Sequence, residues 1–331
     1  MSGGVPLAVA MPVRNALPFL DESVSSILGQ SFGSFEFAIY DDASSDGSSE
    51  RLRQWAERDV RIRLVRGETP LGPAGSAQAA VALSRAPLVA RMDADDVSHT
   101  DRLRRQVEVF AAEPDAVLAG TLGRVIDARG RLLRDVERAP LVRPSAVFPV
   151  GHSSIMFRRE AFDRAGGYRA GTDYWEDIDL FARLAELGRL FVIPEGLCDV
   201  RYSGRGTRVG ADPAELDRAY ARMEARFGGS LSARPGRIPP RLFVHSGSPR
   251  LWAGERPRVL RRLLAVGDLG WNRASLATLA WAIWAEASPA SLRLVLGALA
   301  RLRERAVPDL TGERWVEWRP ARVEPAQPRR G

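Results

Sequence analysis

The sequence has a single cysteine, Cys198, and no lysine, so all 48 of its basic residues are arginines. One cysteine excludes an intrachain disulfide framework and a cysteine metal cage, and it fits a reducing compartment. The sequence also lacks any apolar run of the roughly 18 residues that a membrane span needs. Residues 1–15 show no basic leader and no small-residue cleavage site. We therefore expect a cytoplasmic protein, with peripheral contact at the inner face of the membrane left open.

The formal net charge of +7 is unevenly distributed along the 331 residues. Residues 231–331 carry 18 arginines against 8 acids, whereas residues 1–230 carry 30 arginines against 33 acids. A sequence that uses arginine everywhere gains a high isoelectric point without forming a basic face. Interleaved basic and aromatic residues on one strand or helix face are also missing, which argues against a nucleic-acid partner.

The first part of the chain alternates short apolar runs with segments of helical periodicity. Repeated strand–helix units with short connections predict a mainly parallel sheet that is flanked by helices. The expected strands are 7–12, 35–42, 62–65 and 87–93, and the expected helices are 17–29, 48–57, 72–84 and about 100–112.

The pattern changes after residue 115. Strands are predicted at 116–119, 122–127 and 131–136, with a hairpin turn at 127–131, and helices at about 158–165 and 176–187. The composition predicts three regions: a catalytic domain over 1–228, a Gly-, Pro- and Arg-rich linker over 229–250, and a helical C-terminal appendage over 251–331 with a frayed last fifteen residues. Its helices, expected at 256–266, 272–286 and 288–305, are candidates for a peripheral membrane contact or a homo-oligomer interface.

Three carboxylates follow the fourth predicted strand: Asp93, Asp95 and Asp96. Ligands of parallel α/β sheets bind at the carboxyl ends of the strands. Side chains at 93 and 95 can converge on one Mg²⁺ or Mn²⁺ ion, whose shell phosphate oxygens and water would complete. A solvated Asp-rich turn before a helix explains the same residues equally well, and the spacing alone does not decide between these two interpretations.

A second acidic cluster, "DDASSDGS", ends the second predicted strand. Asp46 and Ser48 fit a turn and a helix cap. Asp41 and Asp42 are explained less well in this way, because two acids that leave a buried strand need partners. One of them can accept hydrogen bonds from a base or a ribose.

A third signal is "GTDYWEDIDLFARL" at 171–184. Acids in a first helical turn are common dipole partners, and the same position suits a general base, because a helix N-terminus keeps a carboxylate ionised. The neighbouring aromatic residue Trp175 is a candidate apolar wall for a sugar ring. His152 is read first as a structural imidazole.

Together, "PVRN", "YDDASSDGS", "MDADD", "GHSSIMFRREAFDRAGGY" and "YWEDIDLFARL" resemble an inverting family 2 glycosyltransferase of the GT-A fold. The resemblance runs from about residue 6 to residue 205, with the motifs in the family's order and spacing. It implies a nucleotide-sugar donor, a divalent cation such as Mn²⁺ or Mg²⁺, and a DxD motif. The fold that it implies is α/β, with a mixed but mainly parallel sheet and a helical appendage.

The resemblance also implies roles for individual residues. Asp42 matches the acid that holds the base, and Asp93 and Asp95 match the DxD pair, with Asp95 as the direct metal ligand. Asp177 matches the catalytic base that deprotonates the acceptor. The remaining implied contacts with the nucleotide are made by Pro12, Val13, Asn15, Asp41 and also Asp93. The residues expected on the acceptor side are His152, Trp175 and Glu176.

Two departures from the family pattern stand out. Many relatives carry an asparagine after the third strand, where this chain has "ETPLGPAGSAQ" at 68–78. Ser203 stands where relatives carry a histidine near the diphosphate, and Arg201, Arg205 or Arg208 are candidates to hold the diphosphate instead. The predicted activity is transfer of a sugar, with a UDP-sugar as first choice, to a hydroxyl of a glycan or lipid-linked acceptor. The alternative is a catalytically degenerate scaffold that still binds nucleotide or glycan.

Overall fold

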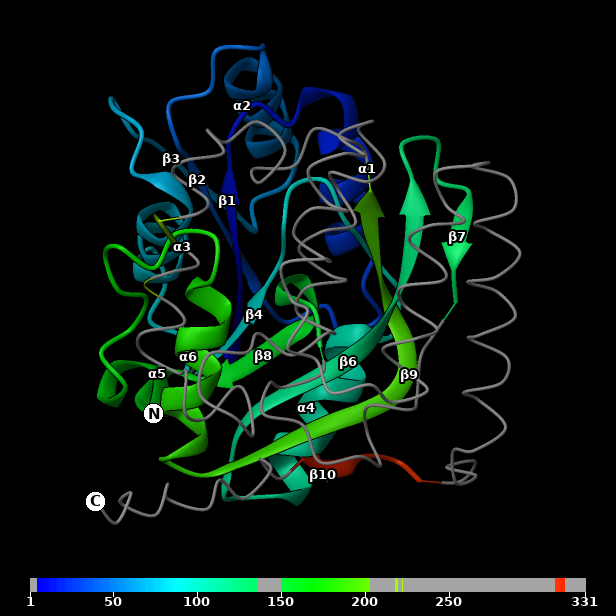
Figure 1. Ribbon diagram of the computed structural model, residues 1–331. Coiled ribbons are helices and arrows are strands. Elements are labelled where there is room, and N and C mark those ends of the chain that lie inside the picture. Colours follow the sequence, from blue (N-terminus) through cyan, green and yellow to red (C-terminus); the bar gives the residue numbers. More distant parts are fainter. Residues whose placement is uncertain (1–4, 136–149, 203–217, 220–221, 223–312, 319–331) are drawn as a thin grey trace, which may run out of the picture.

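The computed structural model describes residues 5–135, 150–202, 218–219, 222 and 313–318 (Figure 1). Their centre is one mixed sheet in the strand order β10-β9-β6-β8-β4-β1-β2-β3, to which β5 and β7 are attached. The strands are β1 (Leu7–Val13), β2 (Glu36–Asp41), β3 (Ile62–Arg66), β4 (Leu88–Arg91), β5 (Val97–Ser98), β6 (Ala116–Asp127), β7 (Leu132–Arg134), β8 (Ile155–Arg158), β9 (Arg189–Tyr202) and β10 (Val316–Trp318).

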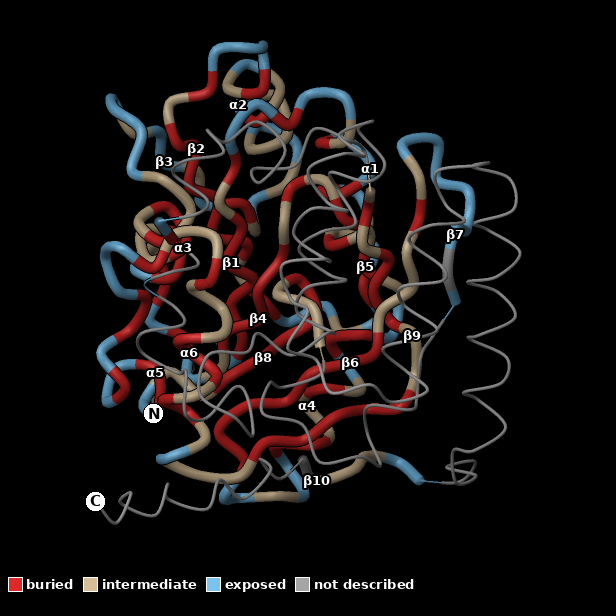
Figure 2. Tube along the Cα trace, viewed as in Figure 1, coloured by how far each residue is buried: buried red, intermediate tan, exposed pale blue. Residues whose placement is uncertain are grey.

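Helices cover both faces of the sheet and form two cores. The helices are α1 (Leu17–Leu28), α2 (Ser48–Arg58), α3 (Gly72–Ala82), α4 (Arg102–Ala112), α5 (Arg159–Arg164) and α6 (Glu176–Ala185). Alternate residues of β1 point to opposite faces, so Val9 and Met11 pack in the core with α1, α2 and α4, while Ala10 joins the core with α3, α5 and α6. Figure 2 shows that the buried residues concentrate in the central strands. The predicted α/β architecture is confirmed.

The parallel strands β3, β2, β1 and β4 end at one edge of the sheet. Val13 at the end of β1 is paired with Asp41 at the end of β2. On the other side of β1, Ala10 is paired with Arg91, and the next amide, Met92 N–H, donates to Ala10 O at 3.1 Å. The two acidic clusters therefore leave the sheet at the same edge, as expected from the order of the strands.

The half of the sheet beyond β4 differs from the sequence prediction. The two strands predicted at 116–119 and 122–127 form one strand, β6, whose pairing with β9 shifts register between Thr121 and Gly123. The strands β8 and β9 were not predicted. Pro194 and Gly196 interrupt the apolar pattern of β9, and both residues are poor strand formers. Pairing with β6 on one side and with β5 and β10 on the other sustains this long strand nonetheless.

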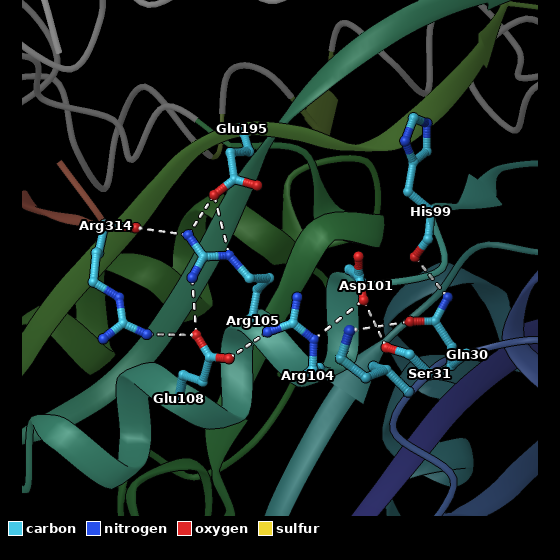
Figure 3. A network of polar contacts seen from close by, with 10 residues as sticks. Gln30, Ser31, His99, Asp101, Arg104, Arg105, Glu108, Glu195 and Arg314 are labelled. Carbon is cyan, nitrogen blue, oxygen red and sulfur yellow. Dashed lines mark hydrogen bonds and ion pairs between the residues drawn. The ribbon is translucent and has the colours of Figure 1, made fainter. Parts of the chain in front are cut away.

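The C-terminal segment 313–318 returns to the mixed sheet. Its strand β10 pairs antiparallel with β9, so the prediction that the last fifteen residues are frayed is wrong for Glu317 and Trp318. Trp315 packs against the core, and Arg314 Nη2 donates to Glu108 Oε2 at 2.9 Å. Figure 3 shows this contact within a network that links α4, β9 and Arg314. The strand β10 forms because it pairs with β9, which is distant in sequence, and the local sequence around residues 316–318 does not indicate this pairing.

The predicted linker at 229–250 and the helices predicted at 256–266, 272–286 and 288–305 lie outside the described residues. Within the described part of the chain, none of the helices is both long and apolar enough to span a membrane.

Candidate active site

The exit of β1 is fastened to the turn that follows β2. Asn15 adopts a positive φ of 52°, its N–H donates to Ser44 Oγ at 3.1 Å, and its Oδ1 accepts from Ser45 N–H at 2.9 Å. Asn15 is a residue that the resemblance assigned to the nucleotide, and its side-chain oxygen is engaged in shaping this turn. Val13 is buried and Pro12 is partly buried beside it.

The two acids at the end of β2, Asp41 and Asp42, have different hydrogen-bond partners. Asp41 is buried and accepts hydrogen bonds from Ser44 N–H at 3.0 Å and from the Ser49 hydroxyl. These contacts make Asp41 a turn and helix-start acceptor, which explains the acid without a ligand. Asp42 is equally buried, and its Oδ1 accepts from Leu71 N–H at 2.6 Å. Asp42 thereby joins the end of β2 to the residue that precedes α3.

The start of α3 is in turn fixed to the loop before α6. Asp173 Oδ1 accepts a hydrogen bond from Ala74 N–H at 3.0 Å, in the first turn of α3. Gly72 has a φ of +76°, and a Cβ atom there would lie 3.2 Å from Asp173 Oδ1, so this approach favours a glycine. The start of α6 consequently lies close to the exit of β2, in agreement with the neighbouring positions of α3 and α6 in Figure 1.

Asp93, the first acid of the DxD pair, has both carboxylate oxygens engaged. Arg91 Nη2 donates to its Oδ1 at 2.7 Å, and the Ser153 hydroxyl donates to its Oδ2 at 2.6 Å. Burial acts to raise the pKa of Asp93, but the opposing effects of Arg91, His152 and Ser153 are stronger and lower that pKa to about 2. Asp93 is therefore an anion held by the protein itself.

Asp95 stands in a different environment from its two acidic neighbours. Apart from its own N–H, no described residue donates a hydrogen bond to the Asp95 carboxylate. Burial and the nearby charge of Asp93 raise the pKa of Asp95 to about 6. Asp96, by contrast, accepts from Arg201 N–H at 2.7 Å through Oδ1, and its Oδ2 lies in hydrogen-bond contact with Ser153 Oγ. Burial and the charges of Asp95 and Asp93 raise the pKa of Asp96 well above its usual value.

The buried Arg201 side chain holds the acidic turn in place through hydrogen bonds. Its Nε donates to Asp95 O at 2.8 Å, its Nη1 to Asp127 O at 3.1 Å, and its Nη2 to Glu22 Oε2. The Arg201 side chain is 1% exposed. With its donors used in this way, Arg201 braces the turn, and the prediction that it holds the diphosphate is wrong. Arg205, Arg208 and Ser203 lie outside the described residues.

The chemistry of the turn fits a divalent cation of the Mg²⁺ or Mn²⁺ type. These hard ions take oxygen ligands and are commonly held by one or two carboxylates together with substrate phosphates. A carboxylate such as Asp95, whose pKa is raised by a neighbouring anion and which has no donor from another described residue, is stabilised by a cation. Among the described residues, no three His, Cys, Asp or Glu side chains are grouped closely enough to hold a metal ion. Asp95 is the carboxylate that would hold the cation.

The acceptor-side residues predicted from sequence form a contact chain beside this turn. His152 Nε2 lies 2.6 Å from the Tyr168 hydroxyl, and His152 Nδ1 lies 3.7 Å from Glu176 Oε1. His152 directly precedes Ser153 in the chain, and its ring therefore connects this segment with Tyr168 and with the first turn of α6. The sequence suggested a structural imidazole, and its burial and two partners agree with that interpretation.

Asp177 and Trp175 flank Glu176 at the start of α6. Asp177 is partly exposed, and its Oδ1 accepts from Ile178 N–H at 2.8 Å. Trp175 is only 3% exposed, so its burial does not support the interpretation of this residue as an open wall for a sugar ring. The helix start thus presents Asp177 and keeps Trp175 inside.

These contacts form a continuous path along one edge of the sheet, from the end of β2 to the turn after β4. Asp42 contacts Leu71, Asp173 contacts the start of α3, and α6 follows Asp173 in the chain. The dipeptide at 152–153 then connects Glu176 with Asp93. The three sequence signals therefore come together, as predicted, at the carboxyl ends of β2 and β4 and the start of α6.

Comparison with known proteins bears directly on this arrangement. Residues 8–166 match the family model described as Glycosyl transferase family 2. The putative glycosyltransferase EpsE of Bacillus subtilis (strain 168) is 33% identical over 209 residues, which cover 61% of this chain and 74% of that protein. The chain belongs to glycosyltransferase family 2. The resemblance stated from the sequence is confirmed, and this family 2 chain is a glycosyltransferase.

Two further proteins extend the comparison. The O-antigen biosynthesis glycosyltransferase WbnJ of Escherichia coli is 27% identical over 184 residues, which are 54% of this chain and 71% of that protein. The mannosyltransferase PcManGT from Pyrobaculum calidifontis, solved in complex with GDP-Man and Mn²⁺, matches 93% of this chain and 89% of its own at 21% identity and a TM-score of 0.55. The likeness to PcManGT confirms the GT-A fold.

The sequence analysis of this family 2 glycosyltransferase missed two residues of the candidate site, Arg91 and Tyr168. Arg91 is 3% exposed in the strand β4, which otherwise reads as an apolar run. A charged residue inside such a run was the available signal, because buried arginines are rarely found without a paired group. Tyr168 gave no comparable signal, since its hydroxyl partner His152 is sixteen residues away.

Proposed function

We propose that this family 2 glycosyltransferase moves one sugar from a nucleotide-sugar, with a UDP-sugar as first choice, to a hydroxyl of a glycan or lipid-linked acceptor. The transfer inverts the anomeric centre and requires a divalent cation. The observation that supports the proposal is the path of contacts that joins the ends of β2 and β4 to the start of α6. The names of EpsE and WbnJ, a glycosyltransferase and an O-antigen biosynthesis glycosyltransferase, support a role in the synthesis of a surface polysaccharide.

In this proposal the side chains of the chain have separate tasks. Asp42 receives the base of the nucleotide, with Val13 and Pro12 packed beside the nucleoside. Asp177 accepts the proton of the acceptor hydroxyl, whose oxygen attacks the anomeric carbon as the bond from that carbon to the diphosphate oxygen breaks. The electron pair of the broken bond leaves with the diphosphate. A cation bound by Asp95 would offset the charge that develops there.

The position of Asp177 suits this role. It lies in the first turn of α6 and is partly exposed, so an acceptor hydroxyl can approach its carboxylate from solvent. An ionised carboxylate is ready to accept a proton, which is the requirement for a general base. The neighbouring acid has different surroundings, because Glu176 Oε1 lies 3.7 Å from His152 Nδ1.

A panel of nucleotide-sugars tests the proposal. We expect one donor to raise the melting temperature of the protein in the presence of Mn²⁺, and we expect Asp95→Ala to abolish the metal-dependent part of that shift. Asp163→Ala is the matched control, because Asp163 is an exposed acid on α5 away from the described contacts of the site. If no nucleotide-sugar binds with or without Mn²⁺, the proposed donor class is wrong.

A further inference from the structure

We propose that the tip of the hairpin between β6 and β7, residues 128–133, docks on an anionic phospholipid surface. Every residue of this hairpin tip is exposed, and the tip carries two leucines and two arginines (Figure 2). The inference goes beyond the proposed function, which assigns no membrane-binding element. Only the use of this docking for a lipid-linked acceptor rests on the proposed function.

The backbone of the hairpin tip is held by Asp127. Its Oδ1 accepts hydrogen bonds from Arg129 N–H at 2.8 Å and from Arg131 N–H at 2.9 Å, and its carbonyl accepts from Gly130 N–H at 3.0 Å. The pairing of β6 with β9 ends at Asp127 and Tyr202. The hairpin tip therefore has a defined shape and projects past the end of β9, as Figure 1 shows.

Two apolar side chains of the hairpin tip are exposed to water. Leu132 is 52% exposed and Leu133 is 45% exposed. Among the exposed large apolar residues of the described chain, these two alone are neighbours in sequence. Single apolar residues on a surface are ordinary, whereas an adjacent pair on a projecting turn offers apolar area that a partner can cover.

The exposed charge of the hairpin tip is positive. Among the described residues, none accepts a hydrogen bond from the Arg129 guanidinium. Arg131 pairs with Asp127 at 2.7 Å, but the Arg131 side chain is 72% exposed and that of Asp127 is 16% exposed, so the cation faces outward. The other acid of the segment, Asp135, follows β7 and lies outside the tip.

This combination matches the boundary of an anionic membrane. Arginine side chains contact lipid phosphate groups with their charged ends, while leucine side chains enter the acyl region below. A strand of another chain is a poorer partner, because β7 has three residues and short edge strands are weak templates for pairing. The charge and the short edge together favour a lipid surface.

The base of the hairpin lies next to the acidic turn. Arg201 Nη1 donates to Asp127 O at 3.1 Å, and Arg201 Nε donates to Asp95 O at 2.8 Å. One buried side chain therefore joins the hairpin to the turn that follows β4. A membrane bound by the hairpin tip would present a lipid-linked acceptor at the end of the sheet that carries the candidate site.

The test measures cosedimentation of the full chain with vesicles of phosphatidylcholine alone and with vesicles in which about a third of the lipid is phosphatidylglycerol. We expect at least about fivefold tighter binding to the anionic vesicles, and we expect it to weaken as NaCl rises from about 0.1 M to about 0.5 M. Leu132→Ser combined with Leu133→Ser should lower the partition coefficient on anionic vesicles at least about fivefold. Arg129→Gln should lower it about fivefold.

Val60→Ser and Arg63→Gln are the matched controls for these variants. Val60 is fully exposed just before β3, and Arg63 is exposed in the first half of β3, so both lie at the edge of the sheet opposite to the candidate site. We expect both control variants to bind the anionic vesicles as wild type does.

A fluorophore identifies the part of the chain that contacts the vesicle. The only cysteine of the sequence, Cys198, is buried, so a cysteine introduced at an exposed position can be labelled selectively. An environment-sensitive dye on Ala128→Cys should shift its emission to shorter wavelength when anionic vesicles are added, and the same dye on Val60→Cys should not. No shift at Ala128→Cys, or equal shifts at both positions, would overturn the inference.

The outcomes separate this inference from the proposed function. If wild type does not prefer anionic vesicles, or if the double leucine variant binds them as wild type does, the inference is overturned while the proposed function stands. If the leucine variant instead abolishes a dimer in sedimentation and keeps vesicle binding, the hairpin tip is a contact between copies and the inference is again overturned. If the hairpin results hold but no nucleotide-sugar raises the melting temperature of wild type, the proposed function fails and the membrane contact stands.

Discussion

Asp173 accepts a hydrogen bond from Ala74 N–H at 3.0 Å, and this contact fixes the loop before α6 to the first turn of α3. The two residues are 99 positions apart in the sequence. Their contact links the start of α3, which Leu71 connects to Asp42, with the loop that precedes Asp177 in the chain.

Asp173→Ala should therefore impair catalysis more than stability. Loss of a side-chain acceptor at a helix start costs about 1 kcal/mol of the free energy of unfolding. A small displacement of Asp177 would lower turnover by on the order of tenfold, because proton transfer depends on position. Urea unfolding and the rate of nucleoside diphosphate release measure the two effects. Normal turnover in Asp173→Ala would show that the contact does not position α6.

Tyr168→Phe tests the contact between Tyr168 and His152. The variant removes the hydroxyl that lies 2.6 Å from His152 Nε2, and we expect the free energy of unfolding to fall by about 1 kcal/mol. Nucleotide affinity should be unchanged, whereas the KM for the acceptor should rise. In a double-mutant cycle, Tyr168→Phe and His152→Gln should have less effect together than the sum of the two single changes. Additive effects would show that the two side chains act separately.

Asp199 gives a prediction for the pH dependence of stability. Burial acts to raise the pKa of Asp199, but the hydrogen bonds with His99 and Arg124 outweigh it and lower the pKa from 3.8 to about 2. A depressed carboxylate pKa stabilises the folded state above the pKa of the unfolded chain, and this contribution is lost as the pH falls through the folded-state value.

We expect Asp199→Asn to lower the free energy of unfolding by about 2 kcal/mol at pH 6. The difference from wild type should begin to shrink near pH 4 and continue to shrink toward pH 2. Urea unfolding of both proteins at pH 6, 5, 4 and 3 measures it. A difference that stays constant over this range would contradict the assignment.

The segment 313–318 should be required for the stability of the catalytic domain. A chain that ends after residue 312 loses β10 and the packing of Trp315, and we expect it to be less stable by about 2 kcal/mol or more. A chain that ends after residue 318 keeps these contacts and serves as the control. Equal melting temperatures for the two shortened chains would show that the segment contributes nothing.

The sequence predicted the sheet up to β4 because β1, β2, β3 and β4 are short apolar runs that alternate with helical patterns. The acids at their ends could be located for the same reason. The division between Asp41 and Asp42 could not be predicted, because it depends on Leu71 and Ser49 reaching one acid each. The strand β9 could not be predicted either, since its order depends on pairing with β6, and Pro194 and Gly196 conceal it in the sequence.

The clearest difference between sequence and structure concerns charge at the DxD turn. The spacing of Asp93 and Asp95 shows only that both side chains can converge on one cation, and the choice of Asp95 as the direct ligand came from the family resemblance. The surroundings of the two carboxylates are unequal, because Asp93 accepts hydrogen bonds from Arg91 and from Ser153. Arg91 lies two residues before Asp93, and Ser153 lies sixty residues after it. Such inequality comes from contacts between distant segments, which a pattern of residue types along the chain does not contain.

The most direct measurement of the central claim compares Asp177→Asn with wild type in a single-turnover transfer assay, with Asp163→Asn as the control for loss of an acid. We predict that Asp177→Asn binds the nucleotide-sugar with unchanged affinity and transfers sugar slower by a factor of about 10² to 10⁴, because the acceptor hydroxyl keeps its proton. Transfer by Asp177→Asn at the wild-type rate would contradict the account.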